Sequence, residues 1–429
     1  MKKVLIISYY WPPAGGPGVQ RVLKFAKYLP RFGWQPIVLT VEGGEYPAFD
    51  LSMEKEIPQS CKVYRVRAFE PGRLYRQFVG LKKGDKIPVA VLTEKKPGWK
   101  KRFANWVRLN LFLPDAKILW KYRAVQEGKR IIAREKPNVL FSSSPPPTVH
   151  LIAKALARHA GLKWVADFRD PWTNIYHYSE LNKSQLAKKM DQHLEYSVLK
   201  NATKITFVNQ GFFNYSEQSN MHLLPNGFDP EDVDDHSEND SNDKFTIRYV
   251  GSLKPRQYVD SFFTVLKNLS LEKKFFRTIR LEFIGNVYPE VRQAIADKNI
   301  SLEINFLGYL EHDKALKYVM HADLLLLVIG PSAIADKLFS GKIFEYIMAR
   351  KPILAYGPIH GAASVLLSST HTGKMYDYKD YEGPENYIVE HYNRWQSKDA
   401  YSDYDQKEIA KYDRKILTQK LVQIFEEII

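Results

Sequence analysis

The feature that most constrains the fold is the alternation of short apolar runs with amphipathic stretches along almost the whole chain. The runs 2–8 and 36–40, KKVLIIS and PIVLT, have the length of buried strands. Between them, Val22, Phe25 and Leu29 recur at helical spacing. A strand–helix–strand unit of this kind implies parallel strands joined by a crossover. The alternation therefore predicts an α/β protein.

The alternation stops once and then restarts. Residues 223–244 read LLPNGFDPEDVDDHSENDSNDK, a polar and acidic run that is typical of a linker. We therefore expect an N-terminal domain at 1–222 and a C-terminal domain at 245–405, with a long amphipathic helix at about 406–429 that crosses back onto the first domain. Each domain should be Rossmann-like, with a mainly parallel sheet. The two sheets would face each other across a cleft, where ligands of such domains bind.

Composition limits the remaining classes of protein. The single cysteine, Cys61, excludes an intrachain disulfide and a cysteine metal cluster. The apolar run at the start is too short for a signal peptide, and there is no apolar run of about 18 residues. We therefore expect a cytoplasmic protein without a membrane span.

The net charge of +15 is unevenly distributed. Eleven of the basic residues lie between Arg73 and Arg108, against two acidic ones, with aromatic residues interleaved up to residue 112. Such a segment favours peripheral contact with an anionic membrane, here the inner face of the plasma membrane. A solvated loop followed by an ordinary amphipathic helix is the alternative for 73–112. We expect no nucleic-acid partner.

Polar residues follow an apolar run in the stretch WVADFRDPW. It contains Asp167, Arg169, Asp170 and Trp172. Two carboxylates flanking an arginine suit the positioning of a polar substrate or a proton transfer. A helix cap with a local ion pair is the alternative.

Two further loops of the N-terminal half follow predicted strands. In SSSPPPT, the hydroxyl of Ser144 either holds an acceptor or caps the next helix. In AGGPG, Gly15 and Gly16 would let backbone amides approach an anion at a helix start, although a plain turn explains them equally well. Arg21, in the first turn of that helix, either pairs with a phosphate or lies on the surface.

Two stretches of the C-terminal half carry positive charge. In YVGSLKPR, Gly251 precedes Lys254 and Arg256, and paired cations at a strand end fit a diphosphate. A solvated turn is the alternative.

The stretch SGKIFEYIMARKPILAYGP combines three features of an anion site. Gly341 would allow close backbone approach at a helix start, and Lys342 adds a positive charge. Glu345, about one turn later, could accept hydrogen bonds from the two hydroxyls of a ribose. A surface glutamate in a favourable first turn is the alternative.

This last stretch resembles the signature helix of family 4 glycosyltransferases with the GT-B fold, as found in bacterial surface-polysaccharide synthesis. YYWPPAGGPGVQRV, LLPNGFD, YVGSL, LEFIG and NFLGYLEHDKALKYVMHADLLLL match in the same order, so the resemblance covers nearly the whole chain. It implies transfer of a hexose from a nucleotide-diphosphate sugar, UDP- or GDP-linked, to a glycan or lipid-linked acceptor. It further implies retention of configuration, with no metal and no other cofactor.

The same resemblance implies roles for the candidate residues. Glu345 would hold the donor ribose, while Arg256 and Lys254 would neutralise its diphosphate. The remaining donor contacts would come from Gly15, Gly16, Gly251, Gly341 and Lys342. Asp170 and Arg169 would be the catalytic residues, and the acceptor would contact Asp167, Trp172 and Ser144.

The sequence also departs from the family pattern. Lys337 stands where a second glutamate is common, beside Asp336, and Ser252 stands where an arginine is usual. Three other functions therefore stay open. They are epimerisation or hydrolysis of a nucleotide sugar, non-catalytic nucleotide-sugar binding and, from charge alone, nucleic-acid binding.

Overall fold

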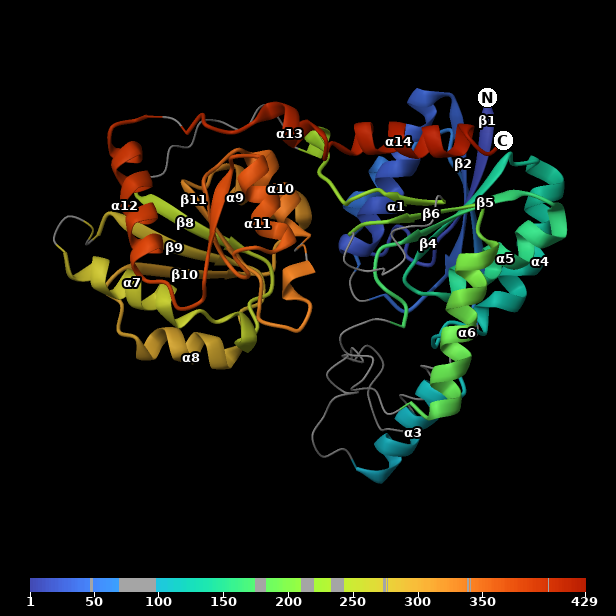
Figure 1. Ribbon diagram of the computed structural model, residues 1–429, viewed down its shortest axis with the longest axis horizontal. Helices are drawn as coiled ribbons and strands as arrows, with labels where there is room; N and C mark the ends of the chain where they lie inside the picture. The colour runs from blue at the N-terminus through green and yellow to red at the C-terminus, as the bar shows by residue number, and fades with distance from the viewer. Residues whose placement is uncertain are drawn as a thin grey trace. The chain divides into compact units, whose positions relative to one another are not determined.

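The computed structural model describes residues 1–46, 49–68, 98–173, 183–209, 220–232, 243–272, 275, 277–337, 339, 341–399 and 401–429. The chain forms two α/β units (Figure 1). Unit 1 comprises residues 1–225 and 417–429, and unit 2 comprises residues 226–416.

Unit 1 contains a seven-stranded parallel sheet in the order β3-β2-β1-β4-β5-β6-β7. Its strands are β1 (Lys2–Ile7), β2 (Trp34–Glu42), β3 (Lys62–Arg67), β4 (Val139–Ser144), β5 (Lys163–Phe168), β6 (Lys204–Phe207) and β7 (Met221–Leu223). Its helices are α1 (Pro17–Tyr28), α3 (Trp99–Asn110), α4 (Trp120–Glu135), α5 (Thr148–Ala160) and α6 (Gln185–Asn201), with short 3₁₀ helices at Leu29–Phe32 and Ser52–Glu56.

The central strand β1 shows why the apolar runs are continuous. Val4 and Ile6 belong to a core cluster that also contains side chains of α1. The intervening Leu5 and Ile7 are also fully buried, on the face that α5 covers. Because strand side chains alternate between faces, a strand covered on both sides must be apolar at every position.

The C-terminal helix predicted at about 406–429 is interrupted. The structure has α13 (Gln406–Ala410) and then α14 (Arg414–Glu426). Between them, the carbonyl of Tyr412 accepts a hydrogen bond from the Phe228 amide at 3.0 Å, and the Arg414 amide donates to the Phe228 carbonyl at 2.8 Å. These backbone groups pair with residue 228 instead of continuing a helix. The later part of α14 packs Leu417 and Phe425 into the core of unit 1.

Unit 2 contains a six-stranded parallel sheet in the order β10-β9-β8-β11-β12-β13. Its strands are β8 (Phe245–Val250), β9 (Ile279–Ile284), β10 (Glu303–Gly308), β11 (Leu324–Val328), β12 (Ile353–Tyr356) and β13 (Gly373–Tyr376). Its other helices are α7 (Asp260–Leu271), α8 (Pro289–Asp297), α9 (His312–Met320), α10 (Lys342–Ala349), α11 (Ala362–Ser369) and α12 (Glu382–Gln396), with 3₁₀ turns at Pro230–Asp232, Pro255–Gln257 and Ala335–Lys337.

Helices cover both faces of the second sheet. Side chains of α7, α8 and α12 share one core cluster with alternate residues of β8, and side chains of α9, α10 and α11 share the other with β11. In each sheet the strand order reverses beside the first strand, between β1 and β4 and between β8 and β11. The carboxyl ends of strands at such a switch point are where doubly wound sheets bind ligands.

The predicted linker belongs partly to the two units. Residues 223–225 lie in unit 1, where the carbonyls of Leu224 and Pro225 each accept a hydrogen bond from Arg21 at 2.8 Å. Residues 226–232 lie in unit 2, and 233–242 are outside the described residues. Among the helices that the structure describes, none combines the length and apolar character needed to cross a bilayer.

Candidate functional site

The glycine-rich loop of unit 1 joins β1 to the start of α1. Gly16 is the residue before the helix and has φ +95°, a conformation that side chains disfavour. A Cβ on Gly15 would lie 3.0 Å from Cβ of Asp50, so this position is also tightly packed. The first turn of α1 has no acidic residue. The phosphate contact predicted for Gly15 and Gly16 at this helix start stays a prediction.

Asp167, predicted to contact the acceptor, lies in the core of unit 1. Its carboxylate forms a two-pronged ion pair with Arg21, at 2.7 and 3.0 Å, and accepts hydrogen bonds from Ser143 Oγ at 2.6 Å and Thr206 Oγ1 at 2.7 Å. Burial alone would raise the pKa of Asp167, but Arg21 and the hydroxyl donors outweigh it and lower that pKa. The carboxylate is fully buried, so it supports the sheet instead of presenting an oxygen to a ligand.

Arg21 is neither on the surface nor available to a phosphate, because the same ion pair and the carbonyls of Leu224 and Pro225 occupy its guanidinium. The side chain is fully buried. Both readings of this residue drawn from the sequence are therefore wrong. The buried Arg21 joins α1 to β5, through Asp167, and to Leu224 and Pro225 after β7.

Arg169, predicted to be catalytic, donates to three backbone carbonyls. Its Nε donates to Ser144 and one terminal nitrogen donates to Pro145, both at 2.8 Å, while the other donates to Gly18. Burial lowers the pKa of Arg169, an effect that the nearby Asp167 and Asp170 oppose. The guanidinium thus ties the end of β5 to the first turn of α1 and to the residues at the end of β4. This geometry favours a positioning role.

The other candidates of unit 1 differ in exposure. Trp172 is buried, and its indole nitrogen donates to Asp191 Oδ1 of α6 at 2.9 Å. Ser144 is buried at the end of β4. Asp170 lies exposed just beyond β5. Of the five candidates after β4 and β5, Asp170 alone presents an exposed carboxylate to a ligand.

In unit 2, three glycines bring the loops after β8, β9 and β10 into backbone contact. Gly251, Gly285 and Gly308 have φ of +118°, +120° and +74°. The Gly251 amide donates to the Ile284 carbonyl at 2.7 Å, and the Gly285 amide donates to the Gly308 carbonyl at 2.6 Å. A Cβ on Gly285 would lie 2.5 Å from the Gly251 carbonyl oxygen, so no side chain fits there.

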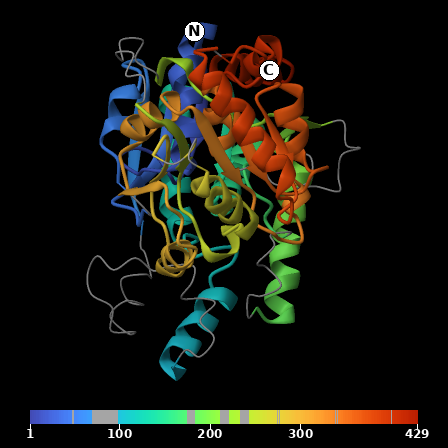
Figure 2. The same cartoon turned by 90° about the vertical axis from the view of Figure 1, so that its left-hand side faces the viewer.

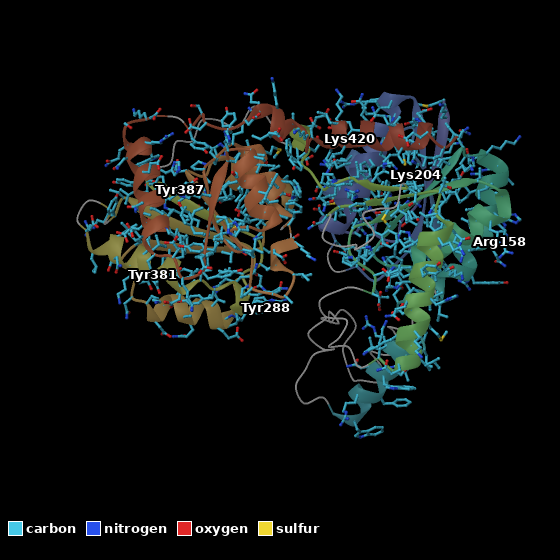
Figure 3. The ribbon with its side chains drawn as sticks, in the orientation of Figure 1. Arg158, Lys204, Tyr288, Tyr381, Tyr387 and Lys420 are labelled. Carbon is cyan, nitrogen blue, oxygen red and sulfur yellow. The ribbon has the colours of Figure 1, made fainter. Side chains whose placement is uncertain are left out.

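The same loops continue into the start of α8. The Leu253 amide donates to the Asn286 carbonyl at 2.9 Å, and the amide of Tyr288, which precedes α8 and is labelled in Figure 3, donates to the Leu253 carbonyl at 3.1 Å. The carboxyl edge of the sheet is therefore a connected backbone surface.

Lys342 reaches back from the start of α10 to this surface. Its amine lies 3.8 Å from the centroid of the Tyr249 ring and would be 2.9 Å from a Cβ on Gly251. The amine is buried and has no hydrogen-bond partner among the described residues. Burial lowers the pKa of Lys342 to about 7, with Glu345 opposing the shift. An unpaired buried amine of this kind is a ready binding group for an anion.

Glu345 follows Lys342 by one helical turn and is partly buried. His312 Nδ1, at the start of α9, lies 3.9 Å from its Oε1. Burial raises the pKa of Glu345, and Asp232 adds to that effect, whereas His312, Lys342 and Arg414 oppose it. The carboxylate therefore sits among charged groups from four segments of unit 2.

Lys254 and Arg256 are exposed after β8, as a diphosphate site requires. The carbonyl oxygen and Cγ of Arg256 lie 3.2 and 3.6 Å from the position of a Cβ on Gly330, which follows β11. Arg256 thus stands where β8 and β11 diverge. Gly341, by contrast, has φ −54° and ψ −33°, ordinary helical values, so its conformation does not require glycine.

Three residues that hold this edge together were not predicted from the sequence. The Tyr346 hydroxyl accepts from the Val250 amide at 2.9 Å and donates to the Leu326 carbonyl at 3.3 Å, so it bridges β8 and β11. Tyr249 supports the Lys342 amine, and His312 faces Glu345. Tyr346 follows Glu345 directly in an apolar helix, which is a weak signal. Nothing in the sequence indicates the other two contacts.

No protein-family model and no curated protein sequence matches the chain. Solved structures do match it over its whole length. Sucrose-phosphate synthase from Thermosynechococcus elongatus aligns with a TM-score of 0.64 and 13% identity, covering 100% of this chain and 99% of that one. HepE from Anabaena, in complex with UDP, aligns with a TM-score of 0.61 and 14% identity, covering 100% of both chains.

WaaG, a glycosyltransferase involved in lipopolysaccharide biosynthesis, aligns with a TM-score of 0.54 and 15% identity, covering 98% of this chain and 99% of that one. At these identities the comparison shows the fold. The chain has the GT-B fold, with two Rossmann-like domains built on parallel sheets.

Proposed function

We propose that the protein is a glycosyltransferase that moves a hexose from a nucleotide-diphosphate sugar to a glycan or lipid-linked acceptor in cell-surface polysaccharide or glycolipid synthesis. The observation that carries the proposal is the buried amine of Lys342 beside Gly251, which has no hydrogen-bond partner in the described part of the chain, with Glu345 one turn further along α10. A diphosphate beside the amine and a ribose beside the carboxylate would use both groups. The shared GT-B fold, and the UDP bound to HepE, support this reading.

The leaving group explains the positive charge. Breaking the bond between sugar and diphosphate builds negative charge on the phosphate oxygens, and fixed donors in a partly dry site stabilise that charge in the transition state. In unit 2, the positive charges of Lys342, Lys254 and Arg256 would stabilise these phosphate oxygens. We propose transfer without a metal, because these groups can perform the charge stabilisation, and with retention of configuration.

Asp170 is the proposed catalytic residue of unit 1, since its carboxylate is exposed while Arg169 is engaged with backbone carbonyls. Asp170→Asn keeps the shape of the side chain and removes its charge. We expect turnover to fall while the affinity for the donor nucleotide stays unchanged. Equal loss of turnover and donor affinity would contradict a role confined to the acceptor side.

The direct test offers UDP-, GDP- and ADP-sugars to the purified protein and measures thermal stabilisation and nucleotide release, with and without acceptors from a cell extract. Nucleotide release that depends on an acceptor is the expected result. Conversion of the donor alone would indicate an epimerase or hydrolase. Stabilisation without turnover with every acceptor would indicate a binding protein. This is the main alternative function, because Lys337 stands where a second glutamate is common in the family.

The place of action follows from the acceptor. We propose a cytoplasmic protein that reaches the inner face of the plasma membrane through the basic segment 73–112. Of that segment, 73–97 lies outside the described residues, and 98–112 is described.

A further inference from the structure

Exposed apolar side chains gather on two helices of unit 1, α3 and α6. On α3, Trp99, Phe103 and Trp106 follow each other at spacings of four and three residues, so they share one face. Their exposed fractions are 71%, 57% and 47%. The set is completed by three exposed aliphatic side chains, and we call all six the α3–α6 ridge. The three are Leu111, just after α3, and Leu186 and Met190 of α6.

A hydrogen bond joins the end of α3 to the start of α6. The side-chain oxygen of Asn110, the last residue of α3, accepts a hydrogen bond from the Ser184 amide at 2.7 Å. Ser184 is the N-cap of α6, and its hydroxyl accepts from Ala187. The end of α3 is thereby fixed to the start of α6, and both views show α3 extending away from the sheet of unit 1 (Figures 1 and 2).

The charge around the ridge has one sign. Residues 98–112 contain Lys100, Lys101, Arg102 and Arg108 and no acidic residue. A second copy docked through the same face would set the guanidinium groups of Arg102 and Arg108 against those of its partner, which disfavours a symmetric dimer. A single-stranded nucleic acid would use the aromatic rings and the cations, but it would leave the aliphatic side chains of Leu111, Leu186 and Met190 in water.

An anionic lipid surface satisfies every part of the ridge. Tryptophan and phenylalanine rings and aliphatic side chains enter the boundary between headgroups and acyl chains, while the flanking cations meet the lipid phosphates. We propose that the α3–α6 ridge docks the protein on an anionic membrane and that the acceptor is accordingly lipid-linked. This inference rests on the proposed glycosyltransferase function for the identity of the acceptor, although the docking itself can be tested without it.

The buried side of α6 connects the ridge to the proposed acceptor loop. Asp191 accepts from the indole nitrogen of Trp172 at 2.9 Å and also pairs with Lys183, while Glu195 accepts from the hydroxyl of Thr173. Trp172 and Thr173 lie two and three residues after Asp170. The helix that presents Leu186 and Met190 therefore also holds the loop that carries the exposed carboxylate, so docking would orient that loop relative to the membrane.

The first experiment measures co-sedimentation with vesicles of phosphatidylcholine alone and with added phosphatidylglycerol. The full-length protein should bind the anionic vesicles more tightly. The triple variant Trp99→Ser, Phe103→Ser, Trp106→Ser should bind them at least about tenfold more weakly, since three aromatic side chains no longer leave water. Arg102→Glu with Arg108→Glu should weaken binding by about fivefold per residue, as for lost attraction to anionic lipid.

Tyr122→Ser is the matched control, because Tyr122 lies on α4 of the same unit and is 72% exposed. It should leave vesicle binding unchanged. Equal vesicle binding by the triple variant and the parent protein would overturn the proposal. Two other results would also overturn it, if the parent protein does not bind vesicles. One is binding of an RNA oligonucleotide that the triple substitution abolishes, and the other is concentration-dependent dimerisation that the triple substitution abolishes.

A second measurement separates this proposal from the proposed function. UDP and GDP binding by the triple variant, followed as a thermal shift, should match that of the parent protein. Transfer to an acceptor embedded in anionic vesicles should fall in the triple variant. Full transfer to a water-soluble glycan, with none to the embedded acceptor, would overturn the lipid-linked assignment. Vesicle binding through the ridge in a protein that never turns over a donor would leave docking supported and the glycosyltransferase proposal contradicted.

Discussion

The carboxyl edges of the two sheets have the same topology, but their charged side chains differ in burial and in hydrogen bonding. In unit 1, Asp167 and Arg169 are buried and their polar atoms are engaged with other groups of the protein. In unit 2, the amine of Lys342 is buried without a hydrogen-bond partner among the described residues, and Lys254 and Arg256 are exposed. Satisfied buried charges stabilise a fold, whereas unsatisfied ones at a switch point are candidates for binding a ligand. We therefore propose that the first edge is a support carrying one exposed carboxylate and that the second, called the binding edge below, binds the donor.

The largest effect should come from breaking the support. Asp167→Asn removes the charge that compensates Arg21 and leaves a buried guanidinium unpaired. We expect the free energy of unfolding of unit 1 to fall by about 3–5 kcal/mol, measured by urea denaturation. Glu54→Gln, which changes an exposed carboxylate in the 3₁₀ helix Ser52–Glu56 of the same unit, is the control and should change it by less than about 0.5 kcal/mol. A small effect of Asp167→Asn would mean that the hydrogen-bond network around Asp167 does not stabilise the fold. The predicted contact of Asp167 with the acceptor would then stand again.

The second effect tests the binding edge. Glu345→Ala should weaken UDP or GDP binding by about 1.5–3 kcal/mol, the contribution of a hydrogen bond to a charged group. Isothermal titration at constant pH measures it. Glu311→Ala provides the control, because Glu311 precedes α9, close to His312 in the chain, and pairs with Lys314 on the surface at 3.0 Å. Unchanged nucleotide affinity in the Glu345 variant would remove the ribose role.

The sequence predicted the architecture because a strand buried on both faces is a continuous run of apolar residues, as in β1 and β11. It failed at the C-terminal helix, since the break at Tyr412 depends on backbone hydrogen bonds to Phe228, almost two hundred residues away in the chain. Local propensity carries no information about such a partner.

For the site, the sequence identified which residues lie at strand ends but not whether each is buried or exposed. It placed Asp167 and Asp170 together at a strand end, yet one is fully buried and the other exposed. That difference comes from Ser143, Thr206 and Arg21, which reach Asp167 from three other elements. Likewise, Lys342 was predicted to be a cation at a helix start. Its contact with Tyr249, and the absence of a hydrogen-bond partner among the residues that the structure describes, follow from the packing of α10 against β8. Charges predicted from sequence need tertiary partners before structural and binding roles can be separated.

The third effect is a pH dependence of stability. The pKa of Lys342 is lowered from 10.5 to about 7 in the folded protein. Below about pH 7 both the folded and the unfolded state carry this proton, and between about 7 and 10.5 the unfolded state alone carries it. Because the unfolded state then binds more protons, this residue makes stability rise with pH by up to about 1.4 kcal/mol per unit.

Lys342→Met removes that contribution. The stability of this variant relative to the parent protein should be greatest below pH 7 and should decline steadily up to about pH 10.5, as measured by denaturation across that range. Lys337→Met, which changes an exposed lysine before α10, should show no such trend. A difference that does not vary with pH would mean that the Tyr249 ring keeps the amine charged throughout.

The smallest effect should come from the exposed cations of unit 2. Lys254→Gln and Arg256→Gln should each weaken binding of inorganic pyrophosphate by about 0.2–1 kcal/mol, because water and salt screen exposed charges. The loss should shrink as salt is added, in titrations at low and high ionic strength, whereas the loss in Lys342→Met should change little, since its amine is buried. The contrast separates two kinds of cation at one edge, those that attract the anion from a distance and the one that holds it. Equal salt dependence in all three variants would mean that Lys342 acts like the exposed cations. The difference between a buried cation that holds the anion and exposed cations that attract it would then be lost.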